Sequence, residues 1–348
     1  MKQSINPERD TSGRVQDDAP ESSRQGHQAA NWALAATLYA ALLAAFWFTA
    51  LKFDMPERIG GHFASAFASF ALLLAPYWAF GFGAAEVLRR WLTWRWARVL
   101  APALLVVPYL VFVLPRGEFH WYYALALAAI PLGLAAMFEF LPPPGPALAW
   151  QDVLALVVVG APVEFRLLAG AWPHPGLSAL PKFEMVLSAL YAFLVVRRVE
   201  GVGFDFRARL RDVAIGLREW AFYAPIAIGL GLLLHFIHFV PRRPGAGTFA
   251  AACLITFFFV AVPEEFFFRG LLQNLLQPRL GRGRALLVTA VIFGLSHFNK
   301  PLPFNWRYVI MAAIAGLFYG RAWLDRRRLT SSAITHTTVD VVWGMWWR

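Results

Sequence analysis

Residues 248–276 read TFAAACLITFFFVAVPEEFFFRGLLQNLL, an apolar run that contains Glu264, Glu265 and Arg269. A helix that crosses a bilayer needs about 20 predominantly apolar residues, and this run is long enough. Ionisable side chains inside such a helix are costly, so they face the interior of a helical bundle or a water-filled cavity. The run therefore predicts a membrane-spanning helix whose three charged side chains face other parts of the protein.

Apolar runs of this kind recur along the whole chain. The other candidates lie near residues 30–51, 63–85, 97–114, 120–140, 150–171, 183–196, 219–240, 285–298, 306–324 and 331–347. Helices satisfy their own backbone hydrogen bonds, which is what a chain in lipid requires. We therefore expect an all-α fold, a polytopic transmembrane helical bundle with about eleven spans.

The composition also indicates a membrane protein. The 348 residues are 59% hydrophobic and 15% charged, whereas soluble chains average about 25% charged residues. A formal net charge of +11 would suit a nucleic-acid-binding protein, but the arginines cluster in short runs between the apolar stretches. Such runs are typical of cytoplasmic loops in membrane proteins. We expect a lipid bilayer, and no nucleic acid, among the partners.

The basic loops also predict an orientation. They follow the second, sixth, eighth and tenth predicted spans, at residues 89–98, 197–211, 279–284 and 326–328. Because these are alternate loops, one orientation places them all in the cytoplasm. We expect a multi-pass protein of the bacterial inner membrane, with a cytoplasmic amino terminus and a carboxyl terminus outside. Arg242 and Arg243 would lie on the outer side and are exceptions to the pattern.

Three parts of the chain differ in character. Residues 1–28 are polar and lack an apolar period, so they predict a disordered cytoplasmic tail. Residues 29–245 form the amino-terminal transmembrane helices, to which the sequence assigns no role. Residues 246–348 hold an unusual density of ionisable residues within their predicted spans. We expect any chemistry to lie in this last part.

Three predicted helices of the last part place polar groups at similar depth. Counted at about 1.5 Å per helical residue from the nearest arginine loop, Glu265 and His297 lie about 20 Å deep. His336 and Asp340 lie roughly 12 and 18 Å deep on the same scale. These depths fall near the middle of a core about 30 Å thick. One polar cavity shared by the three helices would explain the coincidence.

The spacing of these residues suggests their partners. Glu265 and Arg269 are four residues apart, so they share a helix face and can pair. Glu264 points about 100° away and is expected to be free to act on a water molecule. His336 and Asp340 are also four residues apart, so Asp340 can hold one ring nitrogen of the histidine.

These groups suit hydrolysis of a peptide bond. A general base must take a proton from water, and a donor must stabilise the oxyanion. We expect Glu264 to be the base, His297 its partner on the water, and His336 the oxyanion donor. The set Glu264, His297 and His336 could instead bind Zn²⁺, since two histidines and a carboxylate form a catalytic zinc set. The chain has no H-E-x-x-H motif, so both a glutamate-type and a metalloprotease mechanism stay open.

Three motifs in this order resemble those of one protease family. The motifs are E-E-x-x-x-R, F-x-x-x-H and H-x-x-x-N or D, here Glu264, Glu265 and Arg269, then Phe293 and His297, then His336 and Asp340. On successive membrane helices they resemble the CPBP family, the CAAX-processing and bacteriocin-processing intramembrane proteases, also called the Abi family. The resemblance covers about residues 248–347 and does not extend to the first seven spans.

The resemblance implies an intramembrane endopeptidase that cleaves a membrane-associated protein or peptide. It implies that Glu264 and His297 activate the water and that His336 and Asp340 line the oxyanion side. Many members of the family have Asn where this chain has Asp340. Because an ionised Asp would repel an oxyanion, Asp340 must be protonated, bind a metal ion or serve only to orient His336.

Two other functions fit some of the same residues. Buried Glu and His can relay protons in a transporter, but the sequence shows neither a clear inverted repeat nor broken helices. A catalytically silent scaffold of the same fold is the second alternative. The presence of every motif residue in the chain counts against it.

Overall fold

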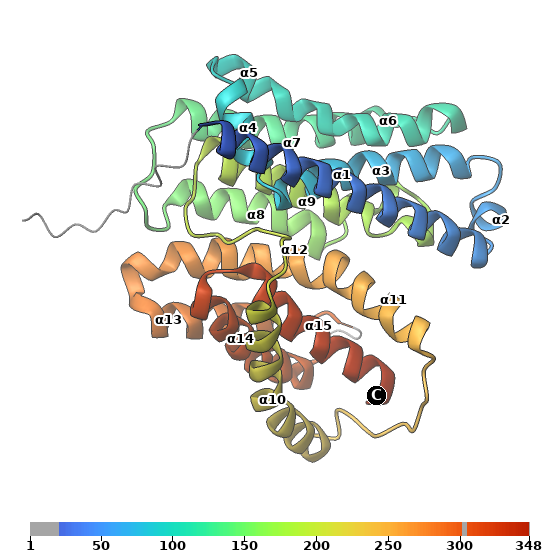
Figure 1. Ribbon diagram of the computed structural model, residues 1–348, viewed down its shortest axis with the longest axis vertical. Coiled ribbons are helices and arrows are strands. Elements are labelled where there is room, and N and C mark those ends of the chain that lie inside the picture. Colours follow the sequence, from blue (N-terminus) through green and yellow to red (C-terminus); the bar gives the residue numbers. More distant parts are fainter. Residues whose placement is uncertain (1–20, 301–304, 348) are drawn as a thin grey trace, which may run out of the picture.

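The computed structural model describes residues 21–300 and 305–347, and every regular element within these ranges is a helix. An isolated bridge between Phe239 and Trp347 is the one β-type contact found there. The helices form two layers, with α1 to α9 in one and α10 to α15 in the other (Figure 1). The predicted all-α polytopic bundle is therefore confirmed.

The first layer contains nine α-helices. Their bounds are α1 Glu21–Lys52, α2 Met55–Ile59, α3 Phe63–Gly81, α4 Ala84–Trp91, α5 Arg95–Leu100, α6 Val107–Val113, α7 Trp121–Phe140, α8 Trp150–Glu164 and α9 Leu180–Leu190. A 3₁₀ segment, Ala101–Val106, joins α5 to α6, and a π-helical segment, Tyr191–Val196, extends α9. Large buried side chains such as Trp172, Tyr77 and Phe193 form the core of this layer.

The second layer carries the predicted site residues. Its helices are α10 Leu210–Leu233, α11 Ala246–Thr256, α12 Val262–Glu265, α13 Asn274–Leu295, α14 Trp306–Arg326 and α15 Leu329–Trp346. Two π-helical segments, η6 Phe257–Ala261 and η7 Phe266–Gln273, flank α12. Helix α13 reverses direction at Gly281, whose φ of 74° suits a residue without a Cβ.

Each predicted apolar stretch overlaps a helix, although residues 165–168 and 234–240 of two stretches lie in turns or irregular backbone. By length and composition, six segments of the described residues are able to cross a membrane, which makes this a multi-pass membrane protein. They are Gln28–Lys52, Phe63–Gly81, Arg95–Arg116, Trp121–Phe140, Leu210–Leu233 and Ala246–Leu295. The last is 50 residues long and contains two of the predicted spans. The other predicted spans correspond to shorter or more polar helices.

Two boundaries differ from the expectations. Helix α1 begins at Glu21, so the prediction of a disordered tail is wrong for residues 21–28; residues 1–20 lie outside the described ranges. Glu, Gln, Arg and Ala are good helix formers, and they extend the apolar helix by polar turns that composition alone does not reveal. Helix α10, which the sequence grouped with the amino-terminal helices, packs against α14 and α15. The two layers are thus divided in the loop 197–209.

Candidate active site

Glu264 and Glu265 lie on α12 at a point where the helix departs from regular α geometry. Pro263 has no N–H, so it cannot donate to a carbonyl in the preceding turn. In a π-helix, with its i→i+5 bonds, the carbonyl left without this donor is that of Phe258. The hydroxyl of Tyr77 on α3 donates to this carbonyl at 3.0 Å. The first layer therefore stabilises the helix immediately before the two glutamates.

Glu265 accepts hydrogen bonds from three side chains inside the protein. Nη1 of Arg269 lies 3.0 Å from Oε1, so the pair expected from the four-residue spacing is present. The hydroxyl of Ser332 donates to Oε2, and Nδ1 of His336 lies 2.8 Å from Oε1. Glu265, Arg269 and Ser332 are fully buried. Loss of any of these hydrogen bonds would leave a buried polar group without a partner, which is costly. Glu265 therefore has a structural role.

Arg269 faces the protein interior. Its Nη2 donates to the carbonyl of Gly316 at 2.9 Å, and its guanidinium lies 4.5 Å above the ring of Phe293. A Cβ at position 316 would lie 3.2 Å from this same nitrogen, so the glycine gives the guanidinium room. Arg269 thus holds α12 and η7 against α14. Through its hydrogen bond to Oε1, Arg269 also fixes the position of the Glu265 carboxylate.

Both ring nitrogens of His336 have carboxylate neighbours. A carboxylate that already accepts from Arg269 can only accept from Nδ1 as well, so Nδ1 carries hydrogen and donates to Glu265. Nε2 lies 3.4 Å from Oδ2 of Asp340 and 3.9 Å from Oε2 of Glu264. The ring stacks on Tyr319, with centroids 4.5 Å apart. The tautomer and the plane of the ring are therefore fixed by other side chains.

His297 follows the end of α13 and is held by the turn before it. Its Nδ1 lies 2.8 Å from the carbonyl oxygen of Phe293. Since a carbonyl only accepts, Nδ1 donates and Nε2 is left with a lone pair. The rings of Phe293 and Tyr308 each lie 4.8 Å from the imidazole. This position gives His297 an acceptor nitrogen suited to holding a water molecule.

Glu264 has a partner that the sequence did not predict. Nζ of Lys182, on α9, lies 3.0 Å from Oε1 of Glu264. The sequence left Glu264 free to act on a water molecule and did not predict this ion pair at Oε1. The lysine lies 82 residues away along the chain, and no local spacing relates it to the glutamate. Oε2 of Glu264 faces His336 and remains available for chemistry.

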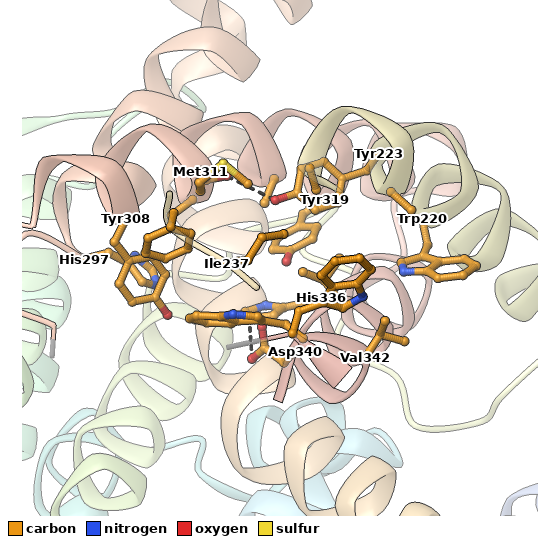
Figure 2. A pocket seen from close by; sticks show the side chains of 18 of the residues that line it. Trp220, Tyr223, Ile237, His297, Tyr308, Met311, Tyr319, His336, Asp340 and Val342 are labelled. Carbon is orange, nitrogen blue, oxygen red and sulfur yellow. Dashed lines mark hydrogen bonds and ion pairs between the residues drawn. The ribbon is translucent and has the colours of Figure 1, made fainter. Parts of the chain in front are cut away.

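The four expected cavity residues line one hollow of about 270 Å³ within the bundle. Glu264, His297, His336 and Asp340 come to it from α12, the end of α13, and α15. Figure 2 shows His297 beside Tyr308 and places His336 close to Asp340. Most of the remaining lining is aromatic or aliphatic and includes Trp220, Tyr223, Phe236, Met311, Trp343 and Trp347. The hollow is thus apolar with one ionisable region, as the shared depth of the predicted helices required.

Residues 246–342 match the family model described as type II CAAX prenyl endopeptidase Rce1-like. The resemblance to the CAAX-processing proteases is confirmed. The matched stretch of the CAAX protease family contains all six predicted site residues, and it does not include α1 to α10. No curated protein and no solved structure matches the chain. The family match supports an intramembrane protease, and the matched stretch lies in the second layer.

The donor atoms of the stretch that matches the family model can be compared with the needs of a metal ion. In the described ranges, no group of three or more His, Cys, Asp or Glu side chains is arranged to hold one. The ammonium group of Lys182 lies 3.0 Å from Oε1 of Glu264, where it would repel a second cation. Nδ1 of His336 donates to Glu265, an arrangement that is compatible with a ligand on Nε2. The ammonium group of Lys182 is therefore the feature that suits a water molecule at Glu264 better than Zn²⁺.

Sequence reasoning missed two residues that complete the site. Ser332 lies four residues before His336, so it shares a helix face with it, and that spacing was a usable signal. Its single hydroxyl hydrogen is shared between two acceptors, the carboxylate of Glu265 and the carbonyl of Tyr319, whose oxygen lies 2.7 Å from the hydroxyl oxygen. Lys182 gave no such signal. Its contact depends on how the two layers pack.

Proposed function

We propose that this protein is an intramembrane endopeptidase that hydrolyses a peptide bond in a membrane-associated protein or peptide, with a water activated by Glu264 and His297. The observation that carries the proposal is the shared cavity. Three segments distant in the sequence bring a carboxylate, two histidines and Asp340 to one hollow. Ionisable groups at such a place in a membrane protein are costly unless they serve a function.

The first step of the reaction is removal of a proton from water. Oε2 of Glu264 accepts the proton, while the lone pair of Nε2 on His297 accepts the second hydrogen of the same water and orients it. The resulting hydroxide attacks the carbonyl carbon of the scissile bond. Glu264 then returns the proton to the leaving nitrogen, so no proton is gained or lost in the cycle.

His336 stabilises the negative oxygen formed in this step. When both of its ring nitrogens carry hydrogen, Nδ1 donates to Glu265 and Nε2 donates to the oxyanion. The Glu265 bond and the stacked ring of Tyr319 hold this donor in place before the reaction. A donor fixed in advance costs little reorganisation, and loss of one such donor typically slows catalysis about 10²–10³-fold.

The cavity lining supports an apolar substrate segment. The aromatic side chains of Trp220, Tyr223 and Trp343 border the same hollow as Glu264. An apolar side chain or lipid group attached to the substrate gains about 25 cal/mol per Å² of apolar surface buried there. The prenylated CAAX peptides named by the family model are one class with such a group, and we propose them as one substrate class to test.

The proposal is tested by identifying cleavages of membrane proteins that depend on Glu264. The new peptide termini in membranes are compared by mass spectrometry between host cells that lack the protein, cells that make the parent chain, and cells that make Glu264→Gln. The matched control is Glu164→Gln, at the end of α8 and outside the cavity lining. We expect termini that appear with the parent and the control but not with Glu264→Gln. Identical membrane termini in all four samples would refute a protease.

A second measurement separates the two classes of mechanism. The purified protein is incubated with a metal chelator, and its cleavage of a peptide identified as above is followed together with its metal content. We propose that cleavage persists after chelation, because Glu264 and His297 hold the water. Stoichiometric zinc that is lost together with activity would show a metalloprotease instead.

A further inference from the structure

The ion pair between Lys182 and Glu264 joins the two layers at the site. Nζ and Oε1 are 3.0 Å apart, and the two side chains are 22% and 17% exposed. Lys182 lies in the first turn of α9, outside the matched stretch 246–342. The first layer, to which the sequence assigned no role, thus contributes a charged side chain to the proposed catalytic glutamate.

The backbone that carries Lys182 is held rigidly against the segment before Glu264. The adjacent residue, Phe183, is buried, and its ring lies 5.0 Å from that of Phe259 on η6 and 5.0 Å from that of Tyr77. Tyr77 in turn donates its hydroxyl to the carbonyl of Phe258. Helices α3 and α9 therefore contact the same turn of η6. A long lysine side chain on this packed surface loses less freedom on pairing than one on a loop.

The pair also determines which oxygen of Glu264 is available. Lys182 occupies Oε1, and Oε2 is the oxygen that lies 3.9 Å from Nε2 of His336. Lys182 reaches Glu264 from outside the cavity lining, whereas Lys300 is the lysine found among the described lining residues, and no ion pair joins Lys300 to Glu264 there. Lys182 makes the shorter of the two ion-pair contacts of Glu264, 3.0 Å at Oε1, and the contact with Nε2 of His336 is 3.9 Å at Oε2.

We propose that Lys182 is a positioning residue of the protease, which holds Oε1 of the Glu264 carboxylate and directs Oε2 towards the water. The inference rests on the proposed function and adds to it. It assigns a part of the site to the amino-terminal layer.

The kinetic test uses three variants in proteoliposomes. Lys182→Met removes the charge and keeps an unbranched apolar chain, Lys182→Arg keeps the charge, and Lys52→Met is the matched control at the exposed end of α1. The probe is a quenched fluorescent peptide with the Glu264-dependent cleavage sequence. We expect kcat of Lys182→Met to fall about 10²-fold, the scale of general-base catalysis, with KM changed less than about twofold. Lys182→Arg should recover most of the loss, and Lys52→Met should equal the parent.

A second measurement does not depend on cleavage. A water-soluble carbodiimide activates the Glu264 carboxyl group, and the Lys182 amine displaces the urea to form an amide bond, with net loss of one water. Mass spectrometry of the digested protein should show a cross-link between the two residues in the parent. The cross-link should be absent from Lys182→Met and from Glu264→Gln.

The two measurements distinguish the possible failures. Parental kcat in Lys182→Met, or no recovery in Lys182→Arg, would overturn the positioning role, as would an absent cross-link in the parent. A larger KM at unchanged kcat would also overturn it, because it would mean that Lys182 binds substrate. A cross-link in a parent chain without any Glu264-dependent cleavage would refute the proposed function while confirming the contact.

Discussion

Nδ1 of His336 lies 2.8 Å from Oε1 of Glu265, and both side chains are buried. The two residues are 71 positions apart, on α15 and α12. Their contact directs the other ring nitrogen, Nε2, to the cavity. The two neighbouring glutamates therefore have different partners: Glu265 binds the histidine and Arg269, whereas Glu264 pairs with Lys182 and faces the hollow.

This division predicts different effects for variants of the two glutamate pairs. Glu264→Gln should abolish cleavage and leave thermal stability nearly unchanged, because Gln keeps the size of the side chain and an acceptor for Lys182. Arg269→Ala should lower both stability and activity. It leaves Glu265 buried without its cation, a change that costs about 3–5 kcal/mol in soluble proteins.

The melting temperature in detergent and the rate of cleavage are measured for these two variants and for a double variant, Glu265→Gln combined with Arg269→Ala. The double variant should recover part of the stability and none of the activity. A Glu264→Gln protein that melts as early as Arg269→Ala, or that still cleaves, would show that the roles of base and structural pair are assigned wrongly.

Ser332→Ala should destabilise the protein through Glu265. The buried hydroxyl has one hydrogen, which is shared between the Glu265 carboxylate and the carbonyl of Tyr319. Hydrogen bonds to charged groups contribute about 1.5–3 kcal/mol, so we expect a clear fall in melting temperature. Ser65→Ala is the control, because that exposed hydroxyl bonds only a carbonyl of its own turn. Equal melting of the two variants would contradict the structural role of Ser332.

Amide substitutions can distinguish the role of Nδ1 of His336 from that of Nε2. Asn places its amide nitrogen near the position of Nδ1, and Gln places it near that of Nε2. We expect His336→Asn to keep more of the stability, because it can still donate to Glu265. His336→Gln should keep more of the activity, because it can still donate to the oxyanion. Melting and kcat of both variants are compared, and the reverse order in kcat would assign the catalytic donor to Nδ1.

Asp340→Asn should retain cleavage within about threefold of the parent, whereas Asp340→Ala should lose more. Oδ2 of Asp340 lies 3.4 Å from Nε2 of His336, and its side chain is partly exposed. An amide at this position can still orient the ring and does not repel a negative oxygen. The measurement is the initial rate of cleavage by the parent, by Asp340→Asn and by Asp340→Ala. Loss of all activity in Asp340→Asn would show that the charge of Asp340 is needed.

The amino and carboxyl termini should lie on opposite sides of the membrane, with the amino terminus in the cytoplasm. In Figure 1, α4, α5 and the turn of α13 lie towards the left, whereas α2 and the carboxyl end of α15 lie towards the right. The arginine loops at 89–98 and 279–284 thus share one side. Reporter fusions at the amino terminus and after Arg348 measure this. Two cytoplasmic reporters would require an even number of spans.

The sequence by itself determined the helices and the identity of most site residues. Helical apolar runs are local properties, so each predicted span overlaps a helix. The pairing of Glu265 with Arg269 also follows from local geometry, because residues four apart share a helix face. The estimated depths then predicted that His297 and the pair His336 and Asp340 share one cavity, which they line.

The tertiary structure decided the partners that link different helices. Packing of α15 against α12 brought His336 to Glu265, and packing of the two layers brought Lys182 to Glu264. Helical periodicity fixes which face a residue occupies and at what depth, but it does not fix which other helix meets that face. A long-range pair such as Lys182 and Glu264 is set by the arrangement of whole helices, for which one sequence contains no local pattern.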